Sequence, residues 1–194
     1  MGLLEKLSLW LGGGAREVSV VVLGLDNSGK SSLLRALHPP PRTPAAEEPP
    51  PPPTVGTRQD HFTAGGVSFS ALEVGGGRRH RALWERHYRA ADALIYVVDA
   101  ADPLRLVVSR SELQLVLAAG GARRVPLLVL ANKSDRPDAL HHLQVAQALS
   151  LEQVQGVPWH ICAASAASGA GLAEGVAWLA RELRTTHASR KGQH

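Results

Sequence analysis

The sequence of 194 residues contains a single cysteine, Cys162, and few aromatic residues. One thiol cannot form an internal disulfide, and it does not have the paired spacing of a structural zinc site. Aromatic residues make up only 4% of the chain, although hydrophobic residues of all kinds make up 44%. The core must therefore be mostly aliphatic. The absence of disulfides favours a reducing compartment, so we expect a cytoplasmic protein.

The sequence also lacks any apolar run near the roughly 18–20 residues that a membrane-spanning helix needs. Residues 1–14 instead predict a short amphipathic helix and a glycine linker, which would bind a membrane peripherally or dock on the protein's own surface. We expect no acylation of Gly2, because Lys6 stands where the myristoylation pattern requires serine or threonine. The apolar residues of this helix are Leu3, Leu4, Leu7, Trp10 and Leu11.

Positive charge is in excess, with a net charge of +4 and an isoelectric point near 9.7. The basic residues are nevertheless spread along the chain, and no aromatic residues are interleaved with them, so we expect no nucleic-acid partner. The densest group, five arginines within residues 78–89, is either solvated or faces an acidic protein or anionic lipid.

Apolar runs alternate with segments of helical periodicity along the chain. This alternation predicts an α/β fold with a mostly parallel six-stranded sheet and helices on both faces, spanning residues 15–186 and followed by a flexible tail at 187–194. The proline-rich stretch 38–53 predicts a stiff insertion, with a ligand for a proline-binding domain as the alternative. Strands are expected at 18–23, 57–63, 67–72, 94–99, 125–131 and 160–163, and helices at 31–37, 104–118, 140–149 and 172–183.

A glycine-bounded loop between the first strand and the first helix matches the pattern G-x-x-x-x-G-K-S. In a P-loop of this kind, backbone N–H groups wrap the phosphates, the charge of Lys30 lies between the terminal phosphates, and the Ser31 hydroxyl coordinates magnesium. A plain glycine turn at a helix cap would not require Lys-Ser at this offset. The candidate phosphate-binding residues are Gly24, Leu25, Asp26, Asn27, Ser28, Gly29, Lys30, Ser31 and Ser32.

A second motif, Asn132-Lys133-Ser134-Asp135, follows the apolar run 125–131. The carboxylate of Asp135 can accept both N1–H and the exocyclic N2–H of guanine, a donor pair that adenine lacks. Asn132 and Lys133 are the accompanying candidates. After the last strand, Cys162 and Ala163 either present a backbone N–H to guanine O6 or are simply a buried strand end.

These segments, together with Pro53-Thr54-Val55-Gly56, resemble the small GTPases of the Arf and Arf-like family. The opening residues 1–4 and the segments 83–85, 158–163 and 174–176 are similar to the Bardet-Biedl subgroup, which recruits the BBSome coat to ciliary membranes. The resemblance implies a small GTPase fold that binds GTP or GDP with Mg²⁺ and acts as a monomer. It also implies a BBSome-like coat as partner, an exchange factor, an activating protein, and a place on membranes at the cilium or ciliary base.

The resemblance also implies roles for single residues. Thr54 would be the switch I threonine that binds Mg²⁺ and senses the γ-phosphate, and Gly76 would offer its backbone N–H to that phosphate. The hairpin 57–72 would be the interswitch, which displaces the N-terminal helix when the nucleotide changes. The expected metal ligands are Ser31, Thr54 and, through water, Glu73. The expected coat-binding surface includes Trp84, His87 and Tyr88, with a place in the core as the alternative for Trp84.

The chain departs from the family pattern where D-x-x-G-Q is usual, because it reads Glu73-Val74-Gly75-Gly76-Gly77. Gly77 replaces the glutamine that orients the attacking water, so we expect no catalytic residue at this position and very slow hydrolysis of GTP. Glu73, longer by one methylene than aspartate, either crowds the Mg²⁺ water shell or reaches it from a displaced backbone. Alternative functions are a degenerate nucleotide-binding scaffold and a P-loop enzyme that turns over nucleotide.

Overall fold

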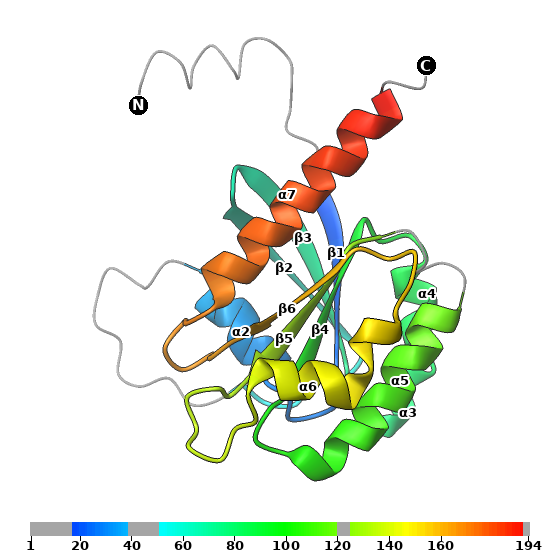
Figure 1. Cartoon of the computed structure of the whole chain (residues 1–194). Coiled ribbons are helices and arrows are strands. Elements are labelled where there is room, and N and C mark those ends of the chain that lie inside the picture. The colour runs from blue at the N-terminus through cyan, green and yellow to red at the C-terminus, as the bar shows by residue number, and fades with distance from the viewer. Residues whose placement is uncertain (1–16, 39–50, 120–124, 192–194) are drawn as a thin grey trace.

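The computed structural model describes residues 17–38, 51–119 and 125–191, and in these ranges the chain forms a single twisted sheet with helices on both sides (Figure 1). The strand order is β2-β3-β1-β4-β5-β6. Only β2 runs antiparallel to its neighbour, as the hairpin partner of β3. The strands are β1 (Val18–Leu23), β2 (Thr57–Ala64), β3 (Val67–Val74), β4 (Ala93–Asp99), β5 (Leu127–Asn132) and β6 (Trp159–Ala163).

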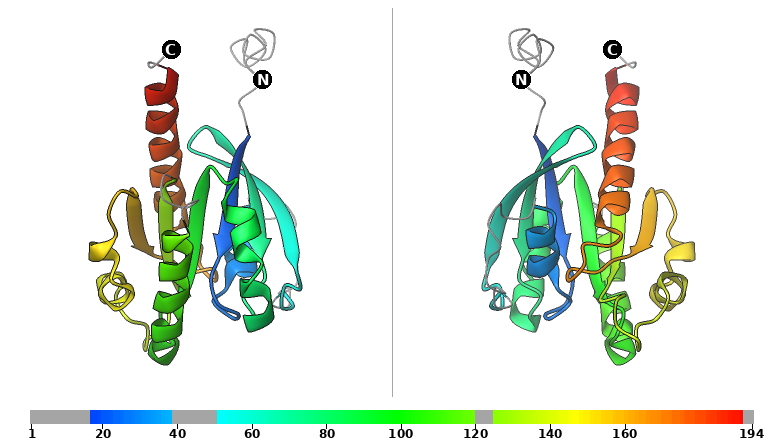
Figure 2. Two further views of the ribbon diagram at one scale, coloured as in Figure 1. Left: turned by 90° about the vertical axis from the view of Figure 1, so that its right-hand side faces the viewer. Right: turned by 90° about the vertical axis from the view of Figure 1, so that its left-hand side faces the viewer.

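The central strands are apolar along their whole length because helices cover both of their faces. Every residue of β5 is buried, and so are all residues of β4 except Asp99. Alternate residues of each strand point to opposite faces, so the core divides into two clusters. One cluster packs on α2 (Lys30–Ala36) and α7 (Leu172–Lys191), and the other on α4 (Trp84–Tyr88), α5 (Leu106–Ala118) and α6 (His142–Leu149) (Figure 2).

The second face carries α4 (Trp84–Tyr88), α5 (Leu106–Ala118) and α6 (His142–Leu149), with α3 (Arg78–Arg81) just before them. The short 3-10 turns η1 (Pro103–Arg105) and η2 (Leu151–Gln153) lead into α5 and out of α6. The predicted fold, a mostly parallel six-stranded sheet between helices, is confirmed. The parallel strands end at one edge of the sheet, where their loops meet.

Some predicted features differ in extent or lie outside the described residues. Helix α7 continues past the expected end at Leu183 to Lys191, so the segment from 187, predicted to be a flexible tail, begins inside a helix. Trp84 and Tyr88, expected on a coat-binding surface, are buried with relative exposures of 2% and 3% and belong to the core. The amphipathic segment 1–14 and most of the proline-rich stretch, 39–50, lie outside the described residues.

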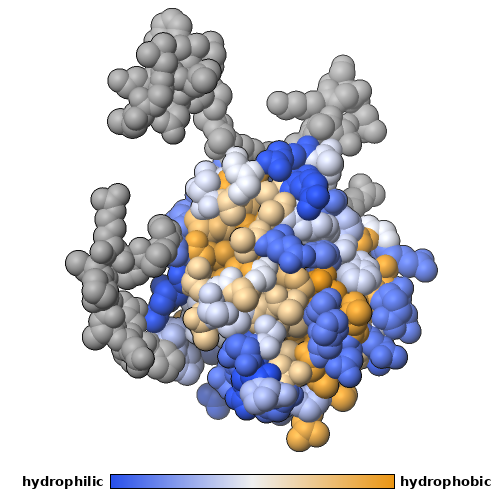
Figure 3. All heavy atoms as spheres, turned by 60° about the vertical axis from the view of Figure 1, so that its left-hand side comes forward, coloured by the Kyte–Doolittle hydropathy of each residue, from blue (hydrophilic) through white to orange (hydrophobic). Residues whose placement is uncertain are grey.

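Within the described part of the chain, no helix combines the length and the apolar character needed to cross a bilayer. On the face that carries α2 and α7, hydrophobic and hydrophilic residues lie interspersed (Figure 3).

Candidate functional site

Two adjoining hollows form a groove at the carboxyl edge of the sheet. They share Asn27, Gly29, Ser32 and Pro51. One hollow, of about 570 Å³, is lined further by Arg35, Ala36, Asn132, Lys133, Asp135, Arg136, Ala166 and Ala167. The other, of about 340 Å³, is lined further by Asp26, Lys30, Ser31, Pro52, Pro53, Thr54, Val55, Glu73, Gly76, Gly77 and His80. The groove therefore joins the predicted base-reading motif to the predicted phosphate and metal residues.

The loop between β1 and α2 curls because its backbone adopts conformations that few residues allow. Gly29, the residue before α2, has φ of 93°, and a Cβ atom there would lie 2.2 Å from Asn132 Nδ2. Glycine is therefore required at this position both by conformation and by space. The Ser28 hydroxyl donates to the Leu25 carbonyl at 2.9 Å and closes the turn from inside.

Lys30 begins α2 and turns its ammonium group back toward the loop. Its Nζ donates to the carbonyl oxygens of Gly24 at 2.9 Å and Leu25 at 2.8 Å, and the residue is only 5% exposed. Burial lowers the pKa of Lys30 to about 8, against an opposing effect of the Glu73 carboxylate. A buried ammonium that is poorly solvated gains strongly from an anionic neighbour such as a phosphate.

Three oxygen-bearing side chains converge beside Lys30. Glu73 Oε1 accepts hydrogen bonds from the Ser31 hydroxyl at 2.6 Å and from the Thr54 hydroxyl at 2.9 Å, and the two hydroxyl oxygens are 3.2 Å apart. Glu73 is 1% exposed, and its Oε2 has no hydrogen-bond partner among the described residues. Hard oxygen donors of this kind suit Mg²⁺, since a hydroxyl that donates to Glu73 still has lone pairs for a cation.

At the other end of the groove, Asn132 ties together loops that are distant in sequence. Its Nδ2 donates to the Ser28 carbonyl at 2.8 Å, and its Oδ1 accepts from the Ala166 N–H at 3.2 Å. Lys133 Nζ pairs with Asp99 Oδ2 at 2.5 Å. Asp135 is exposed on the rim of the groove, and no described residue hydrogen-bonds its carboxylate. Its acceptor atoms are therefore free for a ligand.

The prediction that Cys162 and Ala163 contact the base is not matched by their positions. Both lie inside β6, where Ala163 pairs with Ala131 and the Cys162 side chain is 5% exposed in the core. The groove is lined instead by Ala166 and Ala167, in the loop after the strand. The residues that follow Cys162 are alanines and serines, which are not typical of a base-binding site. The sequence therefore did not indicate that the groove is lined by Ala166 and Ala167.

Gly76 packs directly on the P-loop backbone. A Cβ atom there would lie 2.3 Å from the Leu25 carbonyl carbon and 2.4 Å from the Asp26 nitrogen, so no larger residue fits. Two side chains hold the backbone on either side of this contact. The indole Nε1–H of Trp84 donates to the Gly75 carbonyl at 3.1 Å, and Arg81 Nε donates to the Gly76 carbonyl at 3.0 Å.

A sequence profile of the ADP-ribosylation factor family matches residues 3–183. The chain belongs to this family. Over 186 residues it is 43% identical to ADP-ribosylation factor-like protein 6 of Danio rerio, which covers 95% of this chain and 98% of that protein. It is 37% identical over 168 residues to ADP-ribosylation factor-like protein 3 of Chlamydomonas reinhardtii, with 87% and 92% covered.

Among solved structures, the Arl6 BBS3 small GTPase from Trypanosoma brucei, with bound nucleotide analogue GppNp, superposes with a TM-score of 0.78 and 34% identity. The match covers 87% of the present chain and 98% of that one. The predicted resemblance to the Arf-like proteins and their Bardet-Biedl subgroup is thereby confirmed, as is the small GTPase fold. These relatives support an Arf-like GTP-binding switch.

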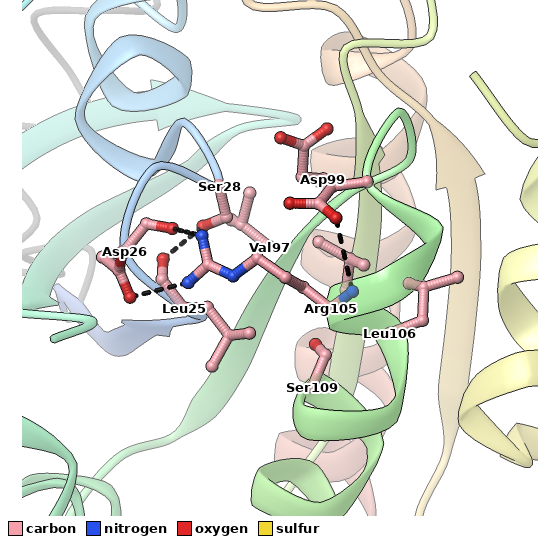
Figure 4. Close-up of a pocket in the computed structure, with 10 residues that line it drawn as sticks. Leu25, Asp26, Ser28, Val97, Asp99, Arg105, Leu106 and Ser109 are labelled. Atoms are coloured by element: carbon pink, nitrogen blue, oxygen red, sulfur yellow. Dashed lines mark hydrogen bonds and ion pairs between the residues drawn. The ribbon is translucent and has the colours of Figure 1, made fainter. Parts of the chain in front are cut away.

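In this Arf-family protein, an ion-pair network lies behind the P-loop, and no sequence motif predicts it. Arg105 donates to the Asp26 carbonyl at 3.0 Å and to Asp26 Oδ1 at 2.7 Å (Figure 4). Arg81 lies 3.6 Å from the same carboxylate and pairs with Glu112 at 2.9 Å. The cavity beside these groups, about 10 Å³, holds a single water at most and shares only Asp26 with the lining of the groove. Charges this far apart in sequence leave no local pattern.

Proposed function

We propose that this Arf-family protein is a GTP-dependent switch that recruits a BBSome-like coat complex to membranes of the cilium or its base. The observation that carries the proposal is the meeting of Ser31, Thr54 and Glu73 beside Lys30, in a groove whose other end holds Asp135. The ammonium and the cluster of hard oxygen atoms at one end of the groove suit the phosphates and Mg²⁺ of a guanine nucleotide. The free carboxylate at the other end suits its base.

At the phosphate end of the groove, Lys30 neutralises charge on the terminal phosphates, and backbone N–H groups of the P-loop bind the other phosphate oxygens. Ser31 and Thr54 would hold Mg²⁺ directly, and Glu73 would hold one of its waters. The bound metal supplies charge neutralisation between the phosphates. Glu73 keeps both hydroxyls oriented, since its Oε1 already accepts from each of them.

At the base end, Asp135 accepts the two N–H groups that distinguish guanine from adenine. Asn132 fixes the P-loop against the loop of Ala166, so the base and phosphate ends keep one spacing. The backbone of Ala166 and Ala167, rather than that of Cys162 and Ala163, faces the base. Lys133, held by Asp99, covers the base with its aliphatic stem.

The nucleotide state is reported by Thr54 and Gly76, which line the same phosphate end from two different segments. Thr54 lies three residues before β2, so a change in its contact with the nucleotide is transmitted to the β2–β3 hairpin. From the hairpin the change reaches the N-terminal segment 1–14, which attaches the protein to the membrane. Gly77 offers no side chain to a hydrolytic water, so intrinsic hydrolysis is very slow. The GTP state then persists until an activating protein acts, and an exchange factor restores it.

The proposal is tested by competition between nucleotides. The protein should bind GTP and GDP tightly with Mg²⁺, more weakly when Mg²⁺ is chelated, and prefer GTP over ATP. Asp135→Asn places an amide donor opposite the base, so GTP affinity should fall about 100-fold while xanthosine triphosphate, with a carbonyl at C2, gains. Equal affinity for ATP and GTP contradicts the proposal, and absence of binding leaves a degenerate scaffold.

The partner is tested with the full chain loaded with GppNp or GDP and offered to purified BBSome and to liposomes. Capture of the coat by the GppNp form alone supports the switch. Equal capture in both states argues against it. Multiple-turnover measurement of phosphate release separates the switch from an enzyme that consumes nucleotide, because the switch should release phosphate at a very low rate.

A further inference from the structure

His80 lies in α3, the four-residue helix that follows Gly77, and its side chain folds back toward the groove. The backbone N–H of His80 donates to the Gly77 carbonyl at 2.8 Å. This hydrogen bond turns the backbone so that the imidazole lies over the glycine run 75–77. The side chain lines the phosphate end of the groove together with Lys30, Thr54 and Glu73. Its neighbours in the helix, Arg78 and Arg79, are exposed and do not line the groove.

The imidazole of His80 has a buried nitrogen with no hydrogen bond. Nδ1 is inaccessible to solvent, and no described residue pairs with it. A buried polar atom without a partner costs about 1–3 kcal/mol, and natural proteins contain few of them. Such an atom beside a ligand groove points to a partner that belongs to the ligand-bound state.

The glycines around His80 leave room for this ring. A Cβ atom on Gly77 would lie 3.4 Å from His80 Nδ1, an ordinary van der Waals distance, so the ring lies next to the start of any side chain at position 77. A Cβ atom on Gly75 would lie 2.9 Å from Nδ1 and 3.1 Å from Cγ, which is too close. The imidazole therefore lies beside the position from which the missing glutamine side chain would extend.

We propose that His80 is a γ-phosphate contact, which takes the place beside the terminal phosphate that a side chain at position 77 leaves empty. In the neutral tautomer that carries its proton on Nδ1, the ring donates this N–H to a γ-phosphate oxygen. GDP has no oxygen at this position, so the contact distinguishes the two nucleotide states and pulls α3 toward the groove only when GTP is bound. This inference rests on the proposed function, because it needs a guanine nucleotide in the groove.

The test measures the affinities of the full chain for GppNp and for GDP, both with Mg²⁺. Hydrogen bonds to charged groups are worth enough to change affinity about ten-fold or more. His80→Ala and His80→Phe should each weaken GppNp binding about ten-fold and leave GDP binding unchanged. The phenylalanine variant keeps the packing over Gly75 and removes only the ring nitrogens. Arg79→Ala, an exposed neighbour on the same helix, is the matched control and should bind both nucleotides as the native chain does.

The outcomes separate the inference from the proposed function. If the native chain prefers GppNp and the two His80 variants bind it equally well, the phosphate contact is wrong and the switch stands. If His80→Ala loses affinity but His80→Phe does not, the ring acts by packing, which also overturns the contact. An equal loss of GDP and GppNp in both variants assigns His80 a structural role. If the native chain binds no guanine nucleotide, the proposed function itself fails.

Discussion

Glu73 has a side chain that is one methylene longer than the aspartate usual in the family, and this length sets what its carboxylate can reach. Its carboxylate reaches far enough to accept hydrogen bonds from both Ser31 and Thr54, so the two hydroxyls are held together before any metal arrives. Its second oxygen is buried without a partner among the described residues. A metal-bound water would satisfy that oxygen, so we expect the longer side chain to reach the Mg²⁺ water shell rather than crowd it.

At the same scale, the position of Cys162 predicts an unreactive thiol. Burial in the apolar core raises its pKa from 9.0 to about 11, with a smaller contribution from Glu174. The thiol then stays protonated through pH 8, and its thiolate fraction there is about 100-fold lower than that of an ordinary cysteine. We expect alkylation by iodoacetamide at pH 8 to be slower in the folded protein than in urea by about this factor.

Because Cys162 is the sole cysteine, whole-protein mass spectrometry follows its labelling directly. The labelling rate of the folded chain should rise as the pH approaches 11. Rapid labelling at pH 8 by a protein that retains its circular dichroism spectrum would contradict the burial of this strand.

The residues of the candidate site were predictable to the extent that they belong to local motifs. Lys30 and Ser31 follow a loop whose spacing fixes their offset, and Asp135 follows the end of a strand. The base contact was predicted at Cys162 and Ala163, a few residues before the Ala166 loop that lines the groove, because small residues at a strand end give no type-specific signal. The position of His80 depends on how its backbone turns after Gly77, and a sequence pattern does not contain that information.

At the scale of elements, α3 and α4 form a segment that is anchored at one end and faces the groove at the other. The anchor is Trp84, which packs edge-on against Tyr96 with ring centroids 6.3 Å apart and donates to the Gly75 carbonyl. The indole thus connects the apolar core to the glycine run beside the phosphate end. If the glycine run 75–77 moves, the hydrogen bond from the Trp84 indole to the Gly75 carbonyl must either move with it or break.

Substitution of Trp84 should therefore separate packing from hydrogen bonding. Trp84→Ala removes a buried ring and should lower the free energy of unfolding by about 3–5 kcal/mol. Trp84→Phe keeps an aromatic ring but leaves the Gly75 carbonyl without its donor, for a loss of about 1–3 kcal/mol. Urea denaturation measures both, and Arg86→Ala, exposed on the same helix, should change stability by less than about 0.5 kcal/mol. A loss in Trp84→Phe as large as in Trp84→Ala would refute this separation.

The order of the elements could be read from the sequence because buried strands and amphipathic helices have different periods. Their ends were less predictable. The expected end of α7 at Leu183 is the last buried residue among the side chains described through residue 186, but the next residues contain no glycine or proline before Gly192. With no breaker, the helix continues as a polar segment beyond the sheet. The short α3 and α4 have too few residues to show a period at all.

At the scale of the molecule, the groove is assembled from loops at the ends of separate strands. Lys30 follows β1, Glu73 belongs to β3, and Asp135 follows β5, so a nucleotide in the groove contacts segments across most of the sheet. Unfolding separates these loops and destroys the groove. Binding and global stability are therefore linked.

This linkage predicts a nucleotide-specific gain in thermal stability. With GTP and Mg²⁺ at about 100 times the dissociation constant, a ligand that binds only the folded chain adds about 2.7 kcal/mol. For a chain of this length, that gain raises Tm on the order of 5–10 °C, which differential scanning fluorimetry resolves. ATP with Mg²⁺ should leave Tm unchanged, because adenine lacks the donor pair for Asp135. Chelation of Mg²⁺ should remove part of the GTP effect, since Ser31 and Thr54 then face the phosphates without a cation. An equal shift with ATP would mean that the phosphate end alone governs binding, and Asp135→Asn would then leave the GTP shift intact.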